Sequence, residues 1–296
     1  MSDDAAWRRN GVLSGALAFL LWGAFPIYFK VAEGVSALEM LAHRVVWAVP
    51  FGLIIVLLRR QWPEVRRIVR APRTLWLLIL SACVIAANWL VYIYAIQADQ
   101  IFQASLGYYI NPLLFVLAGF IFLGERLRKL QTLAVVLAAA GVGVLAVQGG
   151  QFPLVSITLA VTFTVYSLIR KQVVVGAMPG LFVETIVLLP LAVLYLFYLG
   201  ASDQLAFGLD QSRLSLLLLL AGPFTVLPLL FFAIGARRLR LATIGFLQFI
   251  GPTLQFLLAL YYGETLTPAH LVCFGLIWSA VAVFIMDAFL GRTTQT

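Results

Sequence analysis

The sequence is poor in the residues on which most enzymes and soluble domains depend. Only 11% of its 296 residues are charged, and it contains two cysteines and two histidines. Soluble domains carry about 25% charged residues, and a structural zinc or haem site needs a cluster of His and Cys ligands. The composition therefore argues against a soluble domain, and we expect neither a metal nor another cofactor.

The sequence also lacks the motifs of common enzymes. It has no Gly-x-x-x-x-Gly-Lys loop for a nucleotide, no Gly-x-Ser-x-Gly nucleophile and no aspartate-rich metal motif. The net charge of +8 does not indicate nucleic-acid binding, because the basic residues are dispersed over short segments without a recognisable module. We therefore expect a protein that is not an enzyme, is not driven directly by ATP and binds no nucleic acid.

Apolar residues are abundant instead. They make up 63% of the chain, and the mean hydropathy is +1.03. Uncharged stretches recur that reach the roughly 20 residues a helix needs to cross a bilayer, whereas a barrel would show short alternating segments. We predict an all-α integral membrane protein with ten transmembrane helices. The predicted spans are 11–29, 37–58, 74–96, 101–123, 129–147, 153–170, 180–199, 214–235, 240–262 and 268–289.

The distribution of basic residues predicts the orientation of these spans. Lys and Arg gather at alternate loops, and the side of the membrane that is richer in them is normally cytoplasmic. Only Lys30 and Arg213 lie near the other side, and Arg44 lies inside the second span. We therefore expect both termini to face the cytoplasm from an inner membrane. The densest basic segment, 59–73, has helix-like apolar spacing that suits the surface of anionic lipid.

The chain contains an internal repeat. Residues 95–125 and 233–264 carry the same succession of small, polar and proline positions, at offsets of 138 to 140 residues. Five spans per half is an odd number, so the second half must enter the membrane from the opposite side. We predict two inverted five-helix repeats, 1–147 and 148–296, related by a pseudo-two-fold axis. This geometry lets a central site face either side of the membrane in turn.

Four segments resemble a known family. The runs 22–30, 39–47, 104–112 and 248–253 are similar to those of RarD-type permeases of the EamA family, within the drug/metabolite transporter superfamily. The resemblance covers nearly the whole chain. It implies an inner-membrane permease of a family linked to chloramphenicol sensitivity, and it implies helices arranged around a central cavity.

Polar and aromatic side chains inside the spans are the candidates for substrate binding, because such residues are costly in a bilayer and usually face a partner or a watery path. Their aromatic surface suits a flat or amphipathic organic solute. Interhelical hydrogen bonds and interfacial aromatic belts are the alternatives for each of them. The candidates are Trp22, His43, Arg44, Asn88, Tyr92, Tyr108, Asn111, Tyr166, Gln248 and Gln255.

The group Glu39, His43 and Arg44 is the most strongly charged part of any span. Glu39 and His43 lie one helical turn apart on a shared face, so His43 could couple transport to protons and Arg44 could meet an anionic group. An ion-paired structural cluster is the alternative. Pro112 and Pro252 occupy matching repeat positions and are candidate gating hinges, with static kinks as their alternative.

The function that these patterns favour is a secondary transporter that moves a small organic metabolite or drug by alternating access. The alternatives are a passive channel, for which no ring of charged residues is visible, and a membrane sensor without flux. The expected partners are the small-molecule substrate and the lipid bilayer, with protons as a candidate coupling ion. The oligomeric state stays open.

Overall fold

The protein is a bundle of helices. The computed structural model describes residues 2–32, 34–123, 127–148, 152–208, 212–239, 243 and 247–293, and the regular elements in these ranges are all helical. The helices are α1 (Ser2–Gly23), α2 (Phe25–Val31), α3 (Ala37–Leu58), α4 (Trp62–Arg70), α5 (Pro72–Gln97), α6 (Ile101–Leu123), α7 (Lys129–Gln148), α8 (Leu154–Lys171), α9 (Ala177–Ala201), α10 (Ser212–Arg238), α12 (Ile250–Tyr261) and α13 (Pro268–Thr293).

Eight described segments are long and apolar enough to cross a membrane, so the chain is a multi-pass membrane protein. They coincide with eight of the ten predicted spans. The predicted span 101–123 is the helix α6, which has 23 residues. The predicted span 240–262 is described as a regular helix only at α12, which has 12 residues. The number of ten spans therefore stays a prediction. Parts of the repeat motifs, at 124–126, 240–242 and 244–246, lie outside the described residues.

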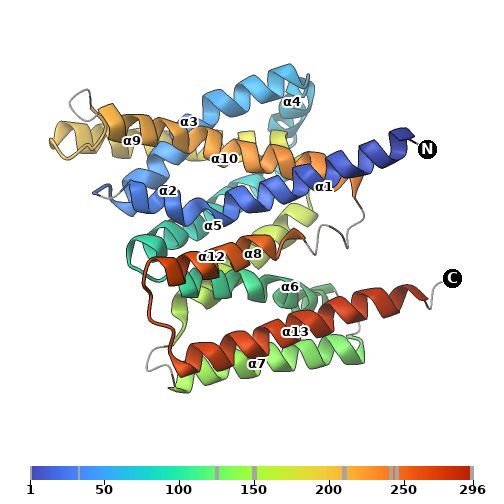
Figure 1. Ribbon diagram of the computed structural model, residues 1–296. Coiled ribbons are helices and arrows are strands. Elements are labelled where there is room, and N and C mark those ends of the chain that lie inside the picture. The colour runs from blue at the N-terminus through green and yellow to red at the C-terminus, as the bar shows by residue number, and fades with distance from the viewer. Residues whose placement is uncertain are drawn as a thin grey trace.

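The two predicted halves are interleaved. α7 packs against α13, α3 against α9, α1 against α10, and α5 against α8. Each of these contacts joins a helix before residue 148 to one after it. Figure 1 shows α7 and α13 side by side at one edge of the bundle, and the start of α1 and the end of α13 lie on the same side. The core is therefore shared between the halves.

Glycine allows the closest of these approaches. A Cβ added to Gly222 of α10 would lie 2.3 Å from the carbonyl oxygen of Trp47 in α3. A Cβ added to Gly107 of α6 would lie 2.8 Å from the carbonyl oxygen of Ser156 in α8. Any side chain at these positions would push the backbones apart, so the two glycines fix the spacing of helices that come from different halves.

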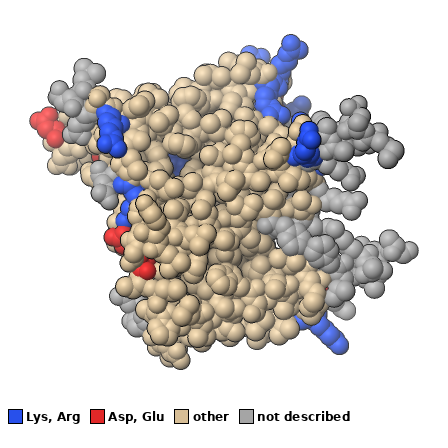
Figure 2. All heavy atoms as spheres, viewed as in Figure 1, with Lys and Arg blue, Asp and Glu red and all other residues tan. Residues whose placement is uncertain are grey.

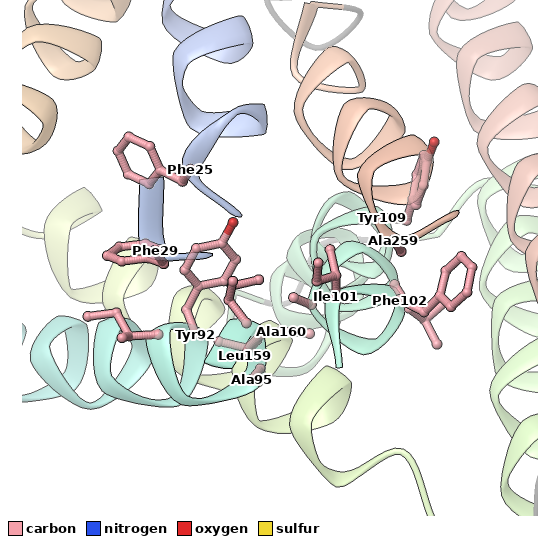
Figure 3. Packing of buried hydrophobic residues seen from close by; sticks show 14 of the residues in the cluster. Phe25, Phe29, Tyr92, Ala95, Ile101, Phe102, Tyr109, Leu159, Ala160 and Ala259 are labelled. Atoms are coloured by element: carbon pink, nitrogen blue, oxygen red, sulfur yellow. The ribbon is translucent and has the colours of Figure 1, made fainter. Parts of the chain in front are cut away.

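The first predicted span is broken in two. α1 ends at Gly23, and α2 starts at Phe25 with Pro26 in its first turn, where proline is tolerated because no intrahelical donor is needed. Phe25, Tyr28 and Phe29 of α2 are all buried in the main core. Figure 3 shows Phe25, Phe29 and Tyr92 of α5 in one region of the core, and the rings of Phe29 and Tyr92 lie 6.0 Å apart. The break therefore places three aromatic side chains in the centre of the bundle.

The basic segment predicted to lie on lipid forms the short helix α4. Val65 and Ile68 are buried against the bundle, while Arg66, Arg67 and Arg70 are exposed. This amphipathic division is the one expected of a helix at the membrane surface. On the face shown in Figure 2, the Lys and Arg side chains lie mainly at the margins, and the broad middle is almost free of charge.

Candidate functional site

Arg44 lies in the interior of the bundle. It is the eighth residue of α3, which begins after Ser36, whose hydroxyl accepts a hydrogen bond from the Glu39 backbone amide. Only 6% of Arg44 is exposed. Its Nε donates to Thr225 Oγ1 of α10 at 2.8 Å. The sequence alone gave no sign of Thr225, because a threonine in a predicted span can bond to its own helix as readily as to another.

Aromatic rings flank the Arg44 guanidinium. Its carbon lies 4.1 Å from the ring centroid of Trp89 in α5 and 5.3 Å from that of Phe25 in α2. Such cation–π contacts stabilise a desolvated guanidinium by about 2 kcal/mol. Three helices of the first half and one of the second therefore surround a single positive charge.

The charge of Arg44 has no carboxylate partner within the described part of the chain. The ion pairs found there join Lys30 to Asp99, Arg128 to Asp287, Arg170 to Glu184, and His43 to Glu39. A buried charge normally needs a paired opposite charge, because removing it from water costs several kcal/mol. Arg44 is thus held by rings and one hydroxyl, without a neutralising group.

Tyr92 adds an unused polar group beside Arg44. Its ring contacts Phe29 and Tyr108, with centroids 6.0 and 5.6 Å apart. The residue is 2% exposed, and its hydroxyl has no hydrogen-bond partner among the described residues. The hydroxyl of Tyr28, in contrast, donates to the carbonyl of Leu217 at 2.9 Å. The Tyr92 hydroxyl is therefore available to a ligand, whereas that of Tyr28 is already occupied.

His43 and Glu39 face a different part of the molecule. His43 Nε2 lies 3.9 Å from Glu39 Oε1, and His43 Nδ1 accepts a hydrogen bond from Trp47 Nε1 at 3.2 Å. The His43 ring lies 5.3 Å from that of Phe207, and Glu39 Oε1 accepts from the backbone amide of Ala206 at 2.7 Å. The shared face predicted for Glu39 and His43 is therefore present. This face contacts the segment after α9 and is directed away from the surroundings of Arg44.

A second buried polar cluster lies in the other half. Glu184 is the eighth residue of α9, and its Oε1 accepts from Ser81 Oγ of α5 at 2.6 Å. Arg170 Nη1 of α8 lies 3.7 Å from the same oxygen, and Tyr166 interacts with Glu184 from one turn earlier in α8. Glu184 takes the same place in α9 that Arg44 takes in α3, the eighth residue.

Two predicted binding residues use their polar groups to join helices. Asn88 Nδ2 donates to the Leu159 carbonyl at 3.0 Å and to Thr162 Oγ1 at 2.8 Å, which ties α5 to α8. Gln255 Nε2 donates to the backbone carbonyl of Trp22 at 3.4 Å, and its Oε1 has no partner among the described residues. The side-chain amide of Asn88 therefore forms hydrogen bonds between helices, which is the alternative to substrate binding. In Gln255 only Nε2 forms such a bond.

The remaining predicted residues are spread along the bundle. Tyr108 lies between Tyr92 and Phe163, whose ring centroid is 6.2 Å from its own. Asn111 is buried in α6, and its Oδ1 has no partner in the described ranges. Gln248 is half-buried in the turn before α12. The structure therefore brings Arg44, Tyr92 and Tyr108 together, and it places the other polar candidates elsewhere.

The gating candidates lie in two helices that pack against each other. Pro112 is inside α6, and Pro252 is in the first turn of α12. Ser105 Oγ of α6 donates to the Pro252 carbonyl at 2.8 Å, so a side chain of one helix bonds to the backbone of the other beside its proline. A change in the bend of either helix would therefore shift the other helix.

Comparisons with known proteins agree with this architecture. The model of the EamA-like transporter family matches residues 9–147. An uncharacterized transporter of Vibrio cholerae is 48% identical over 97% of this chain and 95% of its own length. Protein RarD of Salmonella typhi is 46% identical over 96% of this chain and 97% of its own length. This chain is a RarD-type member of the EamA family. Its membrane helices and its relatives identify it as a membrane transporter.

A crystal structure of a more distant protein supports the fold of this RarD-type chain. The two chains are 23% identical, with a TM-score of 0.60, and the match covers 92% of this chain and 96% of the other.

Two residues of the RarD-type motif 22–30, Phe25 and Tyr28, prove to be part of the Arg44 surroundings although the polar pattern did not single them out. Their aromatic character alone could not distinguish them from core residues.

Proposed function

We propose that this RarD-type chain is a secondary transporter that carries a small organic solute across the cytoplasmic membrane by alternating access. The halves 1–147 and 148–296 would form the two inverted repeats, with both termini in the cytoplasm. The single observation that carries the proposal is the unneutralised Arg44 with its aromatic surroundings, deep in a core shared by both halves. Intramembrane ionisable residues of this kind mark transport pathways.

Two features of the helix packing support an inverted relationship. If the halves correspond helix by helix, α1, α3, α5, α6 and α7 match α8, α9, α10, α12 and α13 in that order. Exchanging the halves then leaves the pairs α3–α9 and α7–α13 unchanged and turns the α1–α10 contact into the α8–α5 contact. All these contacts are present. Arg44 and Glu184 also take the same place in corresponding helices, and each bonds to a hydroxyl on a helix of the opposite half. Bending at Pro112 and Pro252 would open the two sides of the membrane in turn.

Flux into proteoliposomes tests the proposal. A panel of amino acids, organic acids, amines and chloramphenicol is offered as radiolabelled solutes with and without a pH gradient. A carrier gives saturable uptake that is accelerated by unlabelled solute on the opposite side. Non-saturable flux without such acceleration indicates the passive channel, and no flux of any solute with folded protein indicates a sensor. Loss of the pH dependence in His43→Gln supports proton coupling through the Glu39–His43 pair.

A further inference from the structure

Arg44 is a buried residue whose charge has no counter-charge among the described residues. Its Nε bonds to Thr225, and its terminal nitrogens donate none of the hydrogen bonds found in the described ranges. Arg170, a partly buried arginine in the last turn of α8, has Glu184 at 3.7 Å. The two arginines therefore differ in one respect: Arg170 has an internal counter-charge and Arg44 does not.

The rings around Arg44 accept no hydrogen bond from its terminal nitrogens in the described structure. Trp89 and Phe25 meet the ion through their ring faces, at 4.1 and 5.3 Å from its central carbon. Hydrogen bonds of a guanidinium run in its plane, through the N–H groups at its rim, and a carboxylate matches two of them at once. The N–H groups of the two terminal nitrogens are therefore the part of the ion with which a carboxylate would pair.

The buried hydroxyl of Tyr92 supplies a second donor in the same place. Tyr92 lies one turn after Trp89 in α5, and the Trp89 ring lies 4.1 Å from the Arg44 guanidinium carbon. The Tyr92 ring in turn contacts that of Tyr108, with centroids 5.6 Å apart. The Tyr92 hydroxyl has no partner among the described residues, whereas the Tyr28 hydroxyl donates to the Leu217 carbonyl. A buried polar group without a partner is costly, and a ligand that accepts its hydrogen bond removes that cost.

We propose that Arg44 and Tyr92 form an anion-binding subsite, and that the solutes of this transporter are small organic carboxylates with a flat apolar body. The carboxylate pairs with the terminal nitrogens of the Arg44 guanidinium and accepts a hydrogen bond from the Tyr92 hydroxyl. The apolar body lies against the aromatic rings of Trp89, Tyr92 and Tyr108. A cation is disfavoured because it would meet an uncompensated positive charge. This inference rests on the proposed transport function and defines the class of solute.

Binding to the purified protein in lipid nanodiscs tests the subsite without requiring transport. The probes are indole-3-acetate and phenylacetate, with their neutral amides and with tryptamine and phenethylamine as matched cations. A ligand that binds the folded state raises the unfolding temperature. We expect the two carboxylates to raise it and to bind at least about tenfold more tightly than the amides, and we expect the amines to have no effect.

Substitutions assign the effect to the two side chains. Arg44→Gln is expected to remove the preference for carboxylates over amides, and Arg44→Lys to retain part of it because the charge remains without the planar fork. Tyr92→Phe deletes one hydroxyl and is expected to weaken carboxylate binding severalfold. Arg66→Gln, at an exposed position of α4, and Tyr94→Phe, at an exposed position of α5, are the matched controls that leave binding unchanged.

Several results would overturn the inference: equal binding of amides and carboxylates, failure of both carboxylates to bind, or unchanged carboxylate preference in Arg44→Gln. If Arg44→Gln does not fold, Arg44→Lys and Tyr92→Phe decide the question, and unchanged affinity in both overturns it. The transport proposal fails separately. Carboxylate binding without flux in proteoliposomes contradicts transport and leaves the subsite standing, whereas flux of neutral solutes that ignores Arg44 contradicts the subsite alone.

Discussion

Arg44 and Glu184 take the same position in two helices that pack against each other, α3 and α9, yet their charges are opposite. Each is the eighth residue of its helix, and each bonds to a hydroxyl of a helix from the other half, Thr225 for Arg44 and Ser81 for Glu184. Glu184 is also paired with Arg170, whereas Arg44 has no carboxylate among the described residues. A compensated and an uncompensated charge therefore take matching positions in these two helices.

The Arg170–Glu184 pair is expected to stabilise the bundle. Glu184→Gln leaves Arg170 partly buried without a counter-charge, which should lower the free energy of unfolding by roughly 2–3 kcal/mol. The double variant Arg170→Gln with Glu184→Gln should lose less than the sum of the single variants, with a coupling energy of about 1–3 kcal/mol. Chemical denaturation in detergent measures all three. Strictly additive losses would show that the pair contributes no energy as a pair.

A control cycle on a more exposed pair sharpens this result. Asp99, whose side chain is 68% exposed, forms an ion pair with Lys30. Exposed pairs contribute about 0–1 kcal/mol because solvent screens them. The cycle on Lys30→Gln and Asp99→Asn should therefore give a clearly smaller coupling energy than the cycle on Arg170 and Glu184.

Glu264 connects the second half to the start of α6. Its carboxylate accepts hydrogen bonds from the backbone amides of Ile101 and Phe102, the latter at 2.8 Å, and so satisfies donors that have no partner within the helix. Glu264→Ala should lower the free energy of unfolding by about 1–2 kcal/mol, as loss of a helix cap does. Thermal unfolding checks this, and an unchanged unfolding temperature would remove the capping role.

The same residue is expected to give the stability a pH dependence. Burial raises the pKa of the Glu264 carboxyl above its ordinary value of 4.5, although the two backbone hydrogen bonds oppose the shift. The folded state then binds more protons than the unfolded state above that ordinary value. The stability from this shift is complete below pH 4.5 and is lost as the pH rises through the folded pKa. Glu264→Gln should remove this slope, so identical pH profiles of the two proteins would contradict it.

Gly222 should tolerate no side chain. Gly222→Ala places a Cβ 2.3 Å from the Trp47 carbonyl oxygen, so α10 and α3 must separate, at a cost of about 1–3 kcal/mol. Gly143→Ala in α7 is the matched control, because no atom lies within 4 Å of its added Cβ. This control should be neutral or stabilising by up to about 1 kcal/mol through helix propensity. Equal unfolding temperatures for both variants would contradict the predicted close approach.

Pro112 and Pro252 should affect the rate of transport more than the binding of solute. Alanine at Pro112 restores a backbone donor inside α6 and straightens that helix, and alanine at Pro252 releases the fixed φ in the first turn of α12. Conformational exchange should therefore slow severalfold while the affinity for solute in nanodiscs stays the same. Uptake into proteoliposomes and binding to the same preparations separate the two effects. Unchanged uptake kinetics in both variants would identify the prolines as static kinks.

Most of the membrane helices could be predicted from the sequence because each is a continuous apolar run, and a chain inside the bilayer satisfies its backbone groups by forming a helix. Eight predicted spans agree with the structure to within a few residues. The repeat and the family motifs were also visible in the linear order of residues. The formation of each helix depends on residues that are close together in the chain, so local sequence patterns are sufficient to predict it.

The candidate site could be predicted only in part. Asn88 and Tyr92 share one stripe of α5 and were equal candidates, yet Asn88 bonds to α8 and the Tyr92 hydroxyl has no described partner. His43 and Arg44 are neighbours in sequence, but about 100° of helical rotation separates their side chains. They therefore have different partners: His43 contacts Phe207, after α9, and Trp47 of its own helix, whereas Arg44 bonds to Thr225 of α10.

The order of residues was sufficient to predict a bundle of membrane helices with a polar stripe on several of them. Which stripe contacts which depends on the packing of the helices in three dimensions. Arg44 and Thr225 are 181 residues apart, and Ser81 and Glu184 are 103 apart. Helical periodicity assigns a residue to a face, but the partner of that face depends on the packing of helices that are distant in the chain. For this reason the difference between the compensated Glu184 and the uncompensated Arg44 could not be predicted from the sequence.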